Sequence, residues 1–164
     1  MKNYLFVVIL FLISLFSCNE ENFFTEKGAG VDFSVDTIYF DTVFTQLGTA
    51  TRRFTIRNPH NGIVNISEIK LAGGDNSVFR INVDGYSGNV FNNIEIPPQD
   101  SIYIFVDATL DPNNSGDILL QQDSIVTNTN GKTQDIDIVA WGQDVHMIRD
   151  SIIPTQTWTN EKPY

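Results

Sequence analysis

The 164-residue chain has one cysteine, two histidines and few charged residues. A single cysteine excludes an intrachain disulfide, a cysteine-rich zinc site and a paired redox motif. Charged residues make up 18% of the sequence, below the usual quarter, which excludes a coiled coil or an array of long exposed helices. The 20 acidic residues outnumber the 10 basic ones, and the net charge of −10 repels phosphate groups. Nucleic acid is therefore not expected as a partner.

Residues that could carry catalysis are also sparse. His60 and His146 have no serine, cysteine or second histidine at the spacing of a catalytic triad or a zinc site. No glycine-rich phosphate loop, HExxH or GxSxG motif occurs. Residues 111–117 partly match a calcium loop, but Gln122 stands where the bidentate glutamate belongs, so an ordinary long turn is preferred. The sequence therefore predicts a protein that is not an enzyme, with no catalytic residue, cofactor or metal site.

The N-terminal segment has the composition of a secretory signal. Lys2 precedes an apolar run over residues 4–16, and a small serine stands directly before Cys18. The apolar run is shorter than the roughly 20 residues that a helix needs to span a bilayer. The only cysteine of the chain closes this segment, where it has no core to be buried in. We therefore predict a signal peptide over residues 1–17.

The letters L-F-S-C at positions 15–18 resemble the lipobox of bacterial lipoproteins. The resemblance implies removal of a lipoprotein signal peptide before Cys18 and acylation of Cys18, for example with palmitate, so that the membrane becomes a partner. Each buried CH₂ of an acyl chain contributes about 0.8 kcal/mol, so several chains hold a domain on a bilayer. Acidic residues at positions 20 and 21 resemble the surface-export signal of lipoproteins in one large Gram-negative phylum. This implies an outer-membrane lipoprotein that faces the cell exterior, the alternative being a solvated acidic tether.

The mature chain reads as a polar, flexible tether over residues 18–30, followed by β-structure. From residue 31 onward apolar and polar residues alternate with a period of two, and no helical repeat is sustained. Asn130-Gly131 is the strongest hairpin signal, because both residues tolerate positive φ. The predicted strands are 32–35, 37–44, 50–58, 63–71, 77–83, 91–96, 101–109 and a final hairpin near 119–128 and 133–141. The expected core consists of Phe33, Val35, Phe54, Ile56, Ile66, Ile69, Leu71, Phe79, Ile81, Ile94, Ile96, Ile102, Ile104, Val106, Ile136 and Ile138.

Three stretches carry a resemblance to a fold family. They read F-T-I-R-N-P at 54–59, I-V-N-I-S-E-I-K-L-A-G at 63–73 and I-P-P-Q-D-S-I-Y-I-F-V-D-A at 96–108. They resemble the immunoglobulin-like modules of bacterial secreted and surface proteins. They are also similar to the N-terminal module of surface lipoproteins that continue into a right-handed parallel β-helix. The resemblance implies an all-β, immunoglobulin-like antiparallel β-sandwich of about eight strands over residues 31–145.

The last segment, residues 146–164, has no periodicity and is expected to be an extended tail. The letters W-T-N-E-K-P-Y at 158–164 resemble the sequence that directly precedes the β-helix in those lipoproteins. Two interpretations stay open, a frayed chain end and the start of a truncated β-helix.

A short motif of aspartate, hydroxyl residue and apolar residue occurs five times. It resembles the acceptor motif of the general protein O-glycosylation system in the same phylum, which would place glycans on the hydroxyl residue. The alternative is that aspartate and serine or threonine favour turns, after which an apolar residue begins a strand. The candidate hydroxyls are Thr37, Thr42, Ser101, Ser124 and Ser151.

These features predict a non-catalytic, lipid-anchored cell-surface module for display, spacing or binding, with a glycan or a protein as ligand. The alternative is an accessory or N-terminal fragment of a polysaccharide-active β-helix protein. An exposed aromatic row would favour carbohydrate binding, and Tyr103 and Phe105 lie opposite the core face of their strand. Arg53 and Arg57 share one outward face, where cross-strand pairing with acids is the preferred interpretation over anion recognition.

Overall fold

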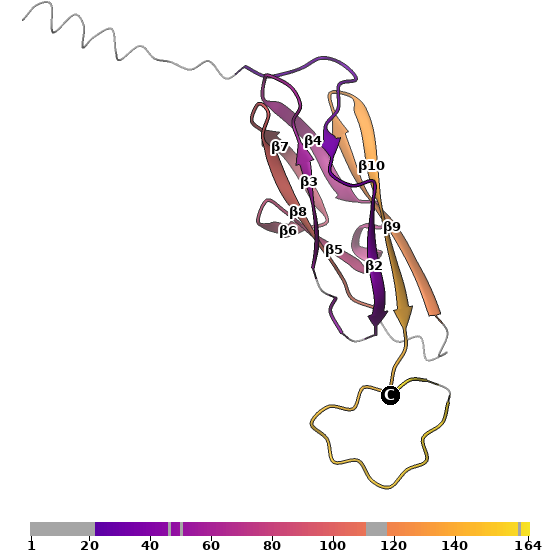
Figure 1. Ribbon diagram of the computed structural model, residues 1–164. Coiled ribbons are helices and arrows are strands. Elements are labelled where there is room, and N and C mark those ends of the chain that lie inside the picture. The colour runs from indigo at the N-terminus through magenta and orange to yellow at the C-terminus, as the bar shows by residue number, and fades with distance from the viewer. Residues whose placement is uncertain (1–21, 46, 50, 111–117, 161) are drawn as a thin grey trace, which may run out of the picture.

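The computed structural model describes residues 22–164 apart from residues 46, 50, 111–117 and 161. Within these residues the chain forms ten β-strands and one 3-10 turn, η1 (Gly74–Asn76). The strands make two five-stranded sheets (Figure 1). The first sheet contains, in spatial order, β1 (Asp32–Phe33), β3 (Arg52–Arg57), β8 (Ser101–Ala108), β5 (Phe79–Val83) and β6 (Tyr86–Gly88). The second contains β2 (Thr37–Phe44), β10 (Lys132–Gln143), β9 (Ile118–Thr129), β4 (Val64–Leu71) and β7 (Val90–Ile96).

The strand order identifies the sandwich as immunoglobulin-like. A constant-type immunoglobulin domain has its first, second, fifth and fourth strands in one sheet and its third, sixth and seventh in the other. Here β1-β3-β8-β5 has the first order and β4-β9-β10 has the second. Strands β6 and β7 are inserted between β5 and β8 along the chain, and β2 lies beside β10. The predicted all-β, immunoglobulin-like sandwich is confirmed.

Two details of the sheets differ from the sequence-based prediction. There are ten strands instead of about eight: nine correspond to the predicted segments, and β6 was not expected. The sandwich is also not wholly antiparallel, because β2 runs parallel to β10 and pairs Ile38 with Ile138. Only three residues separate β1 from β2, so the chain moves from one sheet to the other without reversing its direction. A register shift in this pair leaves Asp41 as an extra residue on β2.

The core lies between the sheets and follows the alternation of the strands. On β8, Ile102, Ile104 and Val106 are buried, whereas Tyr103 between them is exposed. Most of the expected core residues are buried, and Phe33 and Ile94 pack partly buried against them. Val35 is the exception: β1 ends at Phe33, so the period of two stops in the bend before β2 and the side chain is exposed. The core also includes residues that were not predicted, among them Ile38, Phe40, Val43, Val64, Val83 and Ile125.

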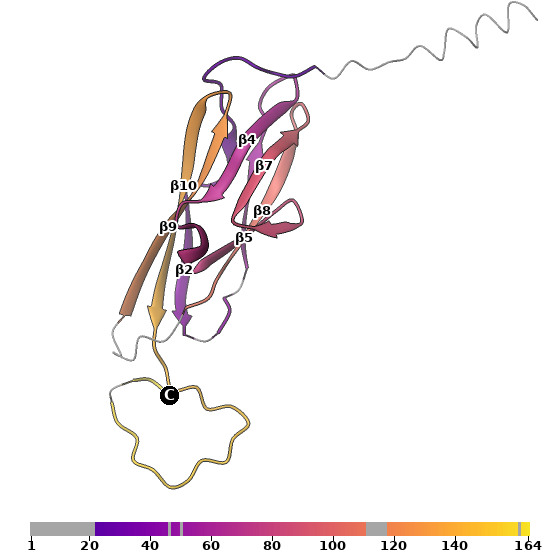
Figure 2. The ribbon, with the colours of Figure 1, turned by 180° about the vertical axis from the view of Figure 1, so that it is seen from behind.

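The hairpin between β9 and β10 has the predicted turn. Asn130 and Gly131 have φ of 49° and 77°, both in the left-handed region that the tightest hairpin turns require. The turn lies at one end of the elongated sandwich, and the 12 residues of β10 lead from it to the other end, a path of about 40 Å at 3.3 Å per residue. The sandwich therefore has two well-separated ends, seen from behind in Figure 2.

Residues 22–30, expected as part of a flexible tether, pack on the end that carries this turn. Phe23 forms a bridge with Ile63, and the ring of Phe24 stacks on His60 with centroids 3.9 Å apart. Gly28 N–H donates to the Asn130 carbonyl at 2.9 Å. The sequence-based prediction did not consider Phe24, which packs partly buried against the core and supplies apolar area that holds this segment in place. Among the described residues, no helix has the length and apolarity needed to cross a bilayer.

Candidate functional site

The predicted modification sites are distributed over both sheets and the tail. Cys18 lies outside the described residues. Thr37 and Thr42 are on β2, the first half-buried and the second exposed. Ser101 begins β8 half-buried, and Ser124 is half-buried on β9. Ser151 is exposed in the tail, where its hydroxyl donates to the Arg149 carbonyl at 2.9 Å.

Three of the five motifs share a local geometry. The carboxylates of Asp41, Asp100 and Asp123 each accept a hydrogen bond from the backbone N–H of the hydroxyl residue that follows, at 2.7–2.8 Å. Only Asp100 lies in a turn before a strand, whereas the motifs at Asp41 and Asp123 lie inside β2 and β9, so the expectation that the motif marks a turn holds for one of these three. The motif therefore has a structural use at these positions, whether or not the hydroxyl carries a glycan.

The groups that could perform acid–base or nucleophilic chemistry do not converge. His60 lies at the end near residues 22–30, where Nε2 is 2.9 Å from the Gly30 carbonyl oxygen. His146 lies in the tail at the opposite end and stacks on Tyr164. Asp123 accepts the N–H groups of Gly73 and Ser124 and the hydroxyl of Ser77, so its carboxylate holds a loop against the sheet.

A metal site is not assembled from the described part of the chain. No group of three or more histidine, cysteine, aspartate or glutamate side chains is close enough there to hold an ion. The partial calcium loop at 111–117 lies outside the described residues.

The outer face of the first sheet carries an arginine and two aromatic rings. Arg53 lies over the ring of Tyr103, with Cζ 5.7 Å from its centroid, and Tyr103 stacks at 6.2 Å on Phe105. Tyr103 is 49% exposed. Arg57 donates to Gln99 Oε1 at 2.8 Å. The preferred pairing of these arginines with acids is not found: the ion pairs among the described residues involve Lys70, Arg149 and Lys162.

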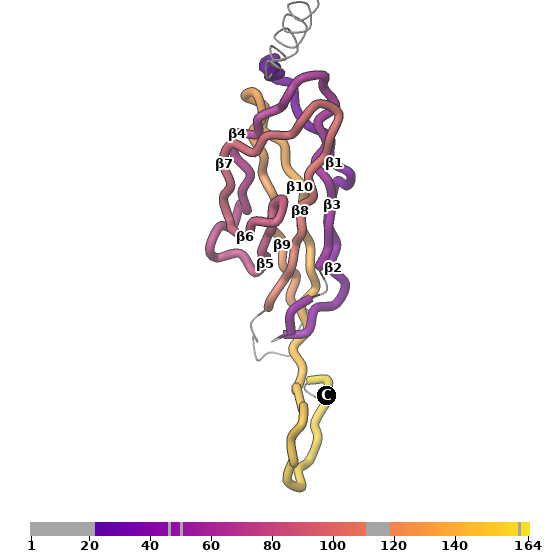
Figure 3. Tube along the Cα trace, turned by 90° about the vertical axis from the view of Figure 1, so that its left-hand side faces the viewer, coloured from indigo at the N-terminus to yellow at the C-terminus, as the bar shows by residue number. Residues whose placement is uncertain are grey.

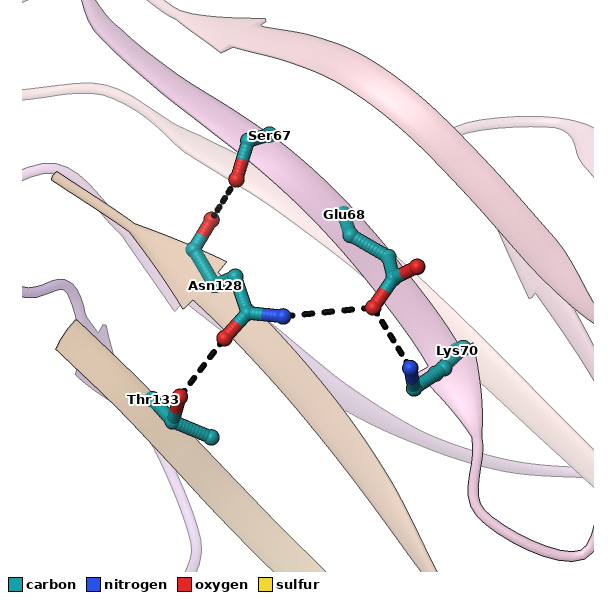
Figure 4. A network of polar contacts seen from close by, with 5 residues as sticks. All are labelled: Ser67, Glu68, Lys70, Asn128 and Thr133. Atoms are coloured by element: carbon teal, nitrogen blue, oxygen red, sulfur yellow. Dashed lines mark hydrogen bonds and ion pairs between the residues drawn. The ribbon is translucent and has the colours of Figure 1, made fainter. Parts of the chain in front are cut away.

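The outer face of the second sheet has a polar half and an aromatic half. The polar half lies near the Asn130-Gly131 turn and is shown in Figure 4. The side-chain amide of Asn128 donates a hydrogen bond to the Glu68 carboxylate at 3.2 Å and accepts one from the Thr133 hydroxyl at 2.7 Å. The backbone carbonyl of Asn128 accepts a hydrogen bond from the Ser67 hydroxyl. Lys70 lies 2.7 Å from the same Glu68 carboxylate. A bulge at Ser67 places two residues of β4 opposite Asn128, which makes the double contact possible.

The aromatic half lies towards the opposite end, on β2, β9 and β10. The rings of Tyr39 and Trp141 are nearly parallel, 11° apart, with centroids separated by 6.3 Å. Tyr39 is 59% and Trp141 40% exposed, although Val139 in the same face is buried. Leu120 pairs with Trp141 across β9 and β10 and is also exposed. Beside the rings, Gln122, Ser124, Asp137 and Val139 help to line a hollow of about 420 Å³.

The tail closes back on the sandwich at the aromatic end. The buried carboxylate of Asp144 accepts the Thr45 hydroxyl at 2.7 Å and the Lys162 ammonium at 2.9 Å. The His146 N–H donates to the Pro163 carbonyl at 2.8 Å. The two ends of the tail therefore meet, and the chain between them forms the loop seen in Figures 1 to 3.

Aromatic rings also stack at the base of this loop. Tyr164 lies 4.7 Å from His146 and 4.3 Å from Trp158, measured between ring centroids. Together with Phe44 at the end of β2, these rings line an apolar groove of about 480 Å³. The sequence-based prediction missed this groove, because residues 146–164 contain no local signal for a loop that returns to the sandwich.

Comparisons with known proteins give distant structural similarity only. No model of a known protein family matches the chain, and no curated protein does. A protein of unknown function from Porphyromonas gingivalis has 15% identity and a TM-score of 0.47, over 76% of this chain and 49% of that one. The E. coli chaperone DraB has 8% identity and a TM-score of 0.42, over 70% of this chain and 55% of that one.

An enzyme also occurs among the similar structures. A family 123 glycoside hydrolase from Clostridium perfringens has 10% identity and a TM-score of 0.43. The match covers 68% of this chain and 24% of the hydrolase. The chain thus spans about half the length of the first two structures and about a quarter of the third.

Proposed function

We propose that the chain is a non-catalytic, lipid-anchored module of the cell surface, attached to the outer membrane through Cys18 and facing the cell exterior. The lone cysteine in L-F-S-C supports the anchor. The observation that carries the proposal is that residues 22–30, which follow the anchor, and the tail occupy opposite ends of the sandwich (Figure 3).

This arrangement gives the module a spacing role. Phe24 and Gly28 are fixed at the Asn130 end of the final hairpin, so the chain that leads from the membrane meets the sandwich there. The tail begins at the far end of β10, about 40 Å further away. The loop and the aromatic half of the second sheet are then the parts that point away from the membrane.

The proposal is tested with an epitope inserted after the exposed Ser151 in the tail loop. On intact cells the epitope should bind antibody and be removed by added protease, and Cys18→Ser should abolish both. A periplasmic protein with the same epitope, which must remain protected, shows that the outer membrane is intact. Access to the tail epitope only after the membrane is permeabilised would contradict the outward orientation.

A second candidate function is an accessory role, or an N-terminal role, in a polysaccharide-active β-helix protein. The observation that favours it is the exposed aromatic pair of Tyr39 and Trp141 on neighbouring strands. Under either function the chain itself should not turn over esters, peptides or polysaccharides. Turnover that disappears when a single aspartate or glutamate is replaced would contradict the non-catalytic proposal.

A further inference from the structure

We propose that a line of exposed aromatic rings on the second sheet and the tail binds a neutral polysaccharide chain. The line, called here the aromatic track, consists of Tyr39, Phe44, Trp141, Trp158 and Tyr164. The inference extends the binding part of the proposed function and does not depend on the lipid anchor, so the two can fail separately.

The rings follow one another along the long axis of the sandwich. Tyr39 stacks on Trp141, as described above. Trp141 pairs in register with Thr42, so the next outward side chain of β2 towards the tail is Phe44. Phe44 in turn lines the same groove as Trp158 and Tyr164. The track thus extends along β2 from Tyr39 to Phe44 and on to the tail.

All five rings are partly exposed to solvent, although Tyr164 is itself stacked on His146 and Trp158. Each is at least 40% exposed, and both tryptophans of the chain are among them. Tyr39 and Trp141 stand on paired strands, which hold a binding side chain more accurately than a loop does. The C–H face of a sugar ring is apolar, and stacking it on an aromatic ring removes apolar surface of both from water.

The polar groups beside the track match sugar hydroxyls. The hollow next to Tyr39 and Trp141 is lined by the Asp137 carboxylate and the Gln122 amide, which can accept hydrogen bonds from hydroxyl donors. Neither this hollow nor the groove at the tail has a lysine or arginine in its lining. A polyanion would meet the Asp137 charge without a compensating cation, so an uncharged polymer is the matching ligand.

The shape of the surface favours a chain over a folded protein. A stable protein–protein interface buries about 800 Å² on each partner around a contiguous apolar centre. Here the exposed aromatic rings of the sheet are confined to β2 and β10, with Leu120 beside Trp141, and the polar network of Ser67, Glu68, Lys70, Asn128 and Thr133 occupies the other half of the same face (Figure 4). A linear ligand can follow these rings without burying the polar groups beside them.

Affinity electrophoresis of the full chain in detergent tests the proposal. The gels contain starch, a β-1,3-glucan, a β-1,4-xylan or a mannan as neutral probes, and polygalacturonate as the anionic probe. We expect at least one neutral polymer to retard the protein and polygalacturonate to leave its mobility unchanged. Trp141→Ala and Trp158→Ala should each weaken the binding of that polymer at least tenfold.

The matched control is Tyr86→Ala, which removes an exposed aromatic ring from β6 of the opposite sheet and should leave the affinity unchanged. Should Trp141→Ala fail to fold, Trp158→Ala in the tail carries the test. Three results would overturn the proposal: no retardation by any neutral polymer, equal loss in Tyr86→Ala, or retardation by polygalacturonate. If the track instead mediates self-association, Trp141→Ala will dissociate an oligomer while no polymer binds, and the proposal also fails.

Discussion

Thr45 and Asp144 are 99 residues apart in the sequence, and the threonine hydroxyl donates a 2.7 Å hydrogen bond to the aspartate carboxylate. Both side chains are buried where β2 and β10 end and the tail begins. Burying a carboxylate is costly unless its oxygens are paired, and Lys162 of the returning tail provides a second contact. This buried polar cluster therefore fixes the tail to the sandwich.

Thr45→Val tests that role. The substitution keeps the shape of the side chain and removes the donor, which leaves the buried Asp144 carboxylate less well paired. We expect a loss of about 1–3 kcal/mol in the free energy of unfolding, measured by urea titration. Thr42→Val, an exposed position on the preceding strand β2, should change it by less than about 0.5 kcal/mol. A Thr45→Val variant as stable as the wild type would show that the hydroxyl does not stabilise the carboxylate.

The alternation along β8 predicts losses of stability of very different size at adjacent positions. Ile104 is fully buried between the sheets, whereas Tyr103 is half-exposed on the outer face. Ile104→Asp should place an unpaired charge in the core and cost several kcal/mol, out of a typical total of about 5–15 kcal/mol. Tyr103→Asp should cost far less. Circular dichroism during thermal unfolding distinguishes the two, and equal destabilisation would contradict the assigned face of the strand.

A stabilising substitution is expected at Thr129. This side chain is fully buried, and its hydroxyl has no hydrogen-bond partner among the described residues. Thr129→Val removes an unpaired polar group and keeps the shape, so the free energy of unfolding should rise by about 1 kcal/mol. Thr133→Val, on the outer face, should lower it slightly because Thr133 donates to Asn128 at 2.7 Å. A decrease in the melting temperature of Thr129→Val would show that the hydroxyl is paired after all.

Local patterns in the sequence predict most of the fold. The alternation along residues 101–108 predicts which side chains of β8 are buried, and Asn130-Gly131 predicts the hairpin turn, because both signals depend only on neighbouring residues. Val35 is misassigned for the same reason. Whether alternation continues past Phe33 depends on where the chain leaves the first sheet, and that is decided by tertiary packing.

The candidate site is less visible in the sequence, because its parts are distant from one another. The alternation around Tyr39 and around Trp141 places each ring on an outer face, but no local signal says that their strands are parallel neighbours. The buried Asp144 and its partner Thr45 likewise meet only after the sandwich has formed. In contrast, the sequence alone predicts that Asn58 in the F-T-I-R-N-P stretch lies in a turn. Its buried amide donates to the carbonyls of Gly62, Ile96 and Pro97.

Attachment of the chain to the membrane through Cys18 is measured by metabolic labelling with a palmitate analogue. Cells that produce the wild-type chain or Cys18→Ser are grown with the analogue, and the label on the purified protein is measured. We expect label on the wild type and none on Cys18→Ser, which should also keep its signal peptide and migrate as a larger species. A wild-type chain that takes up no label would contradict the lipid anchor, and with it the proposal of an outer-membrane module.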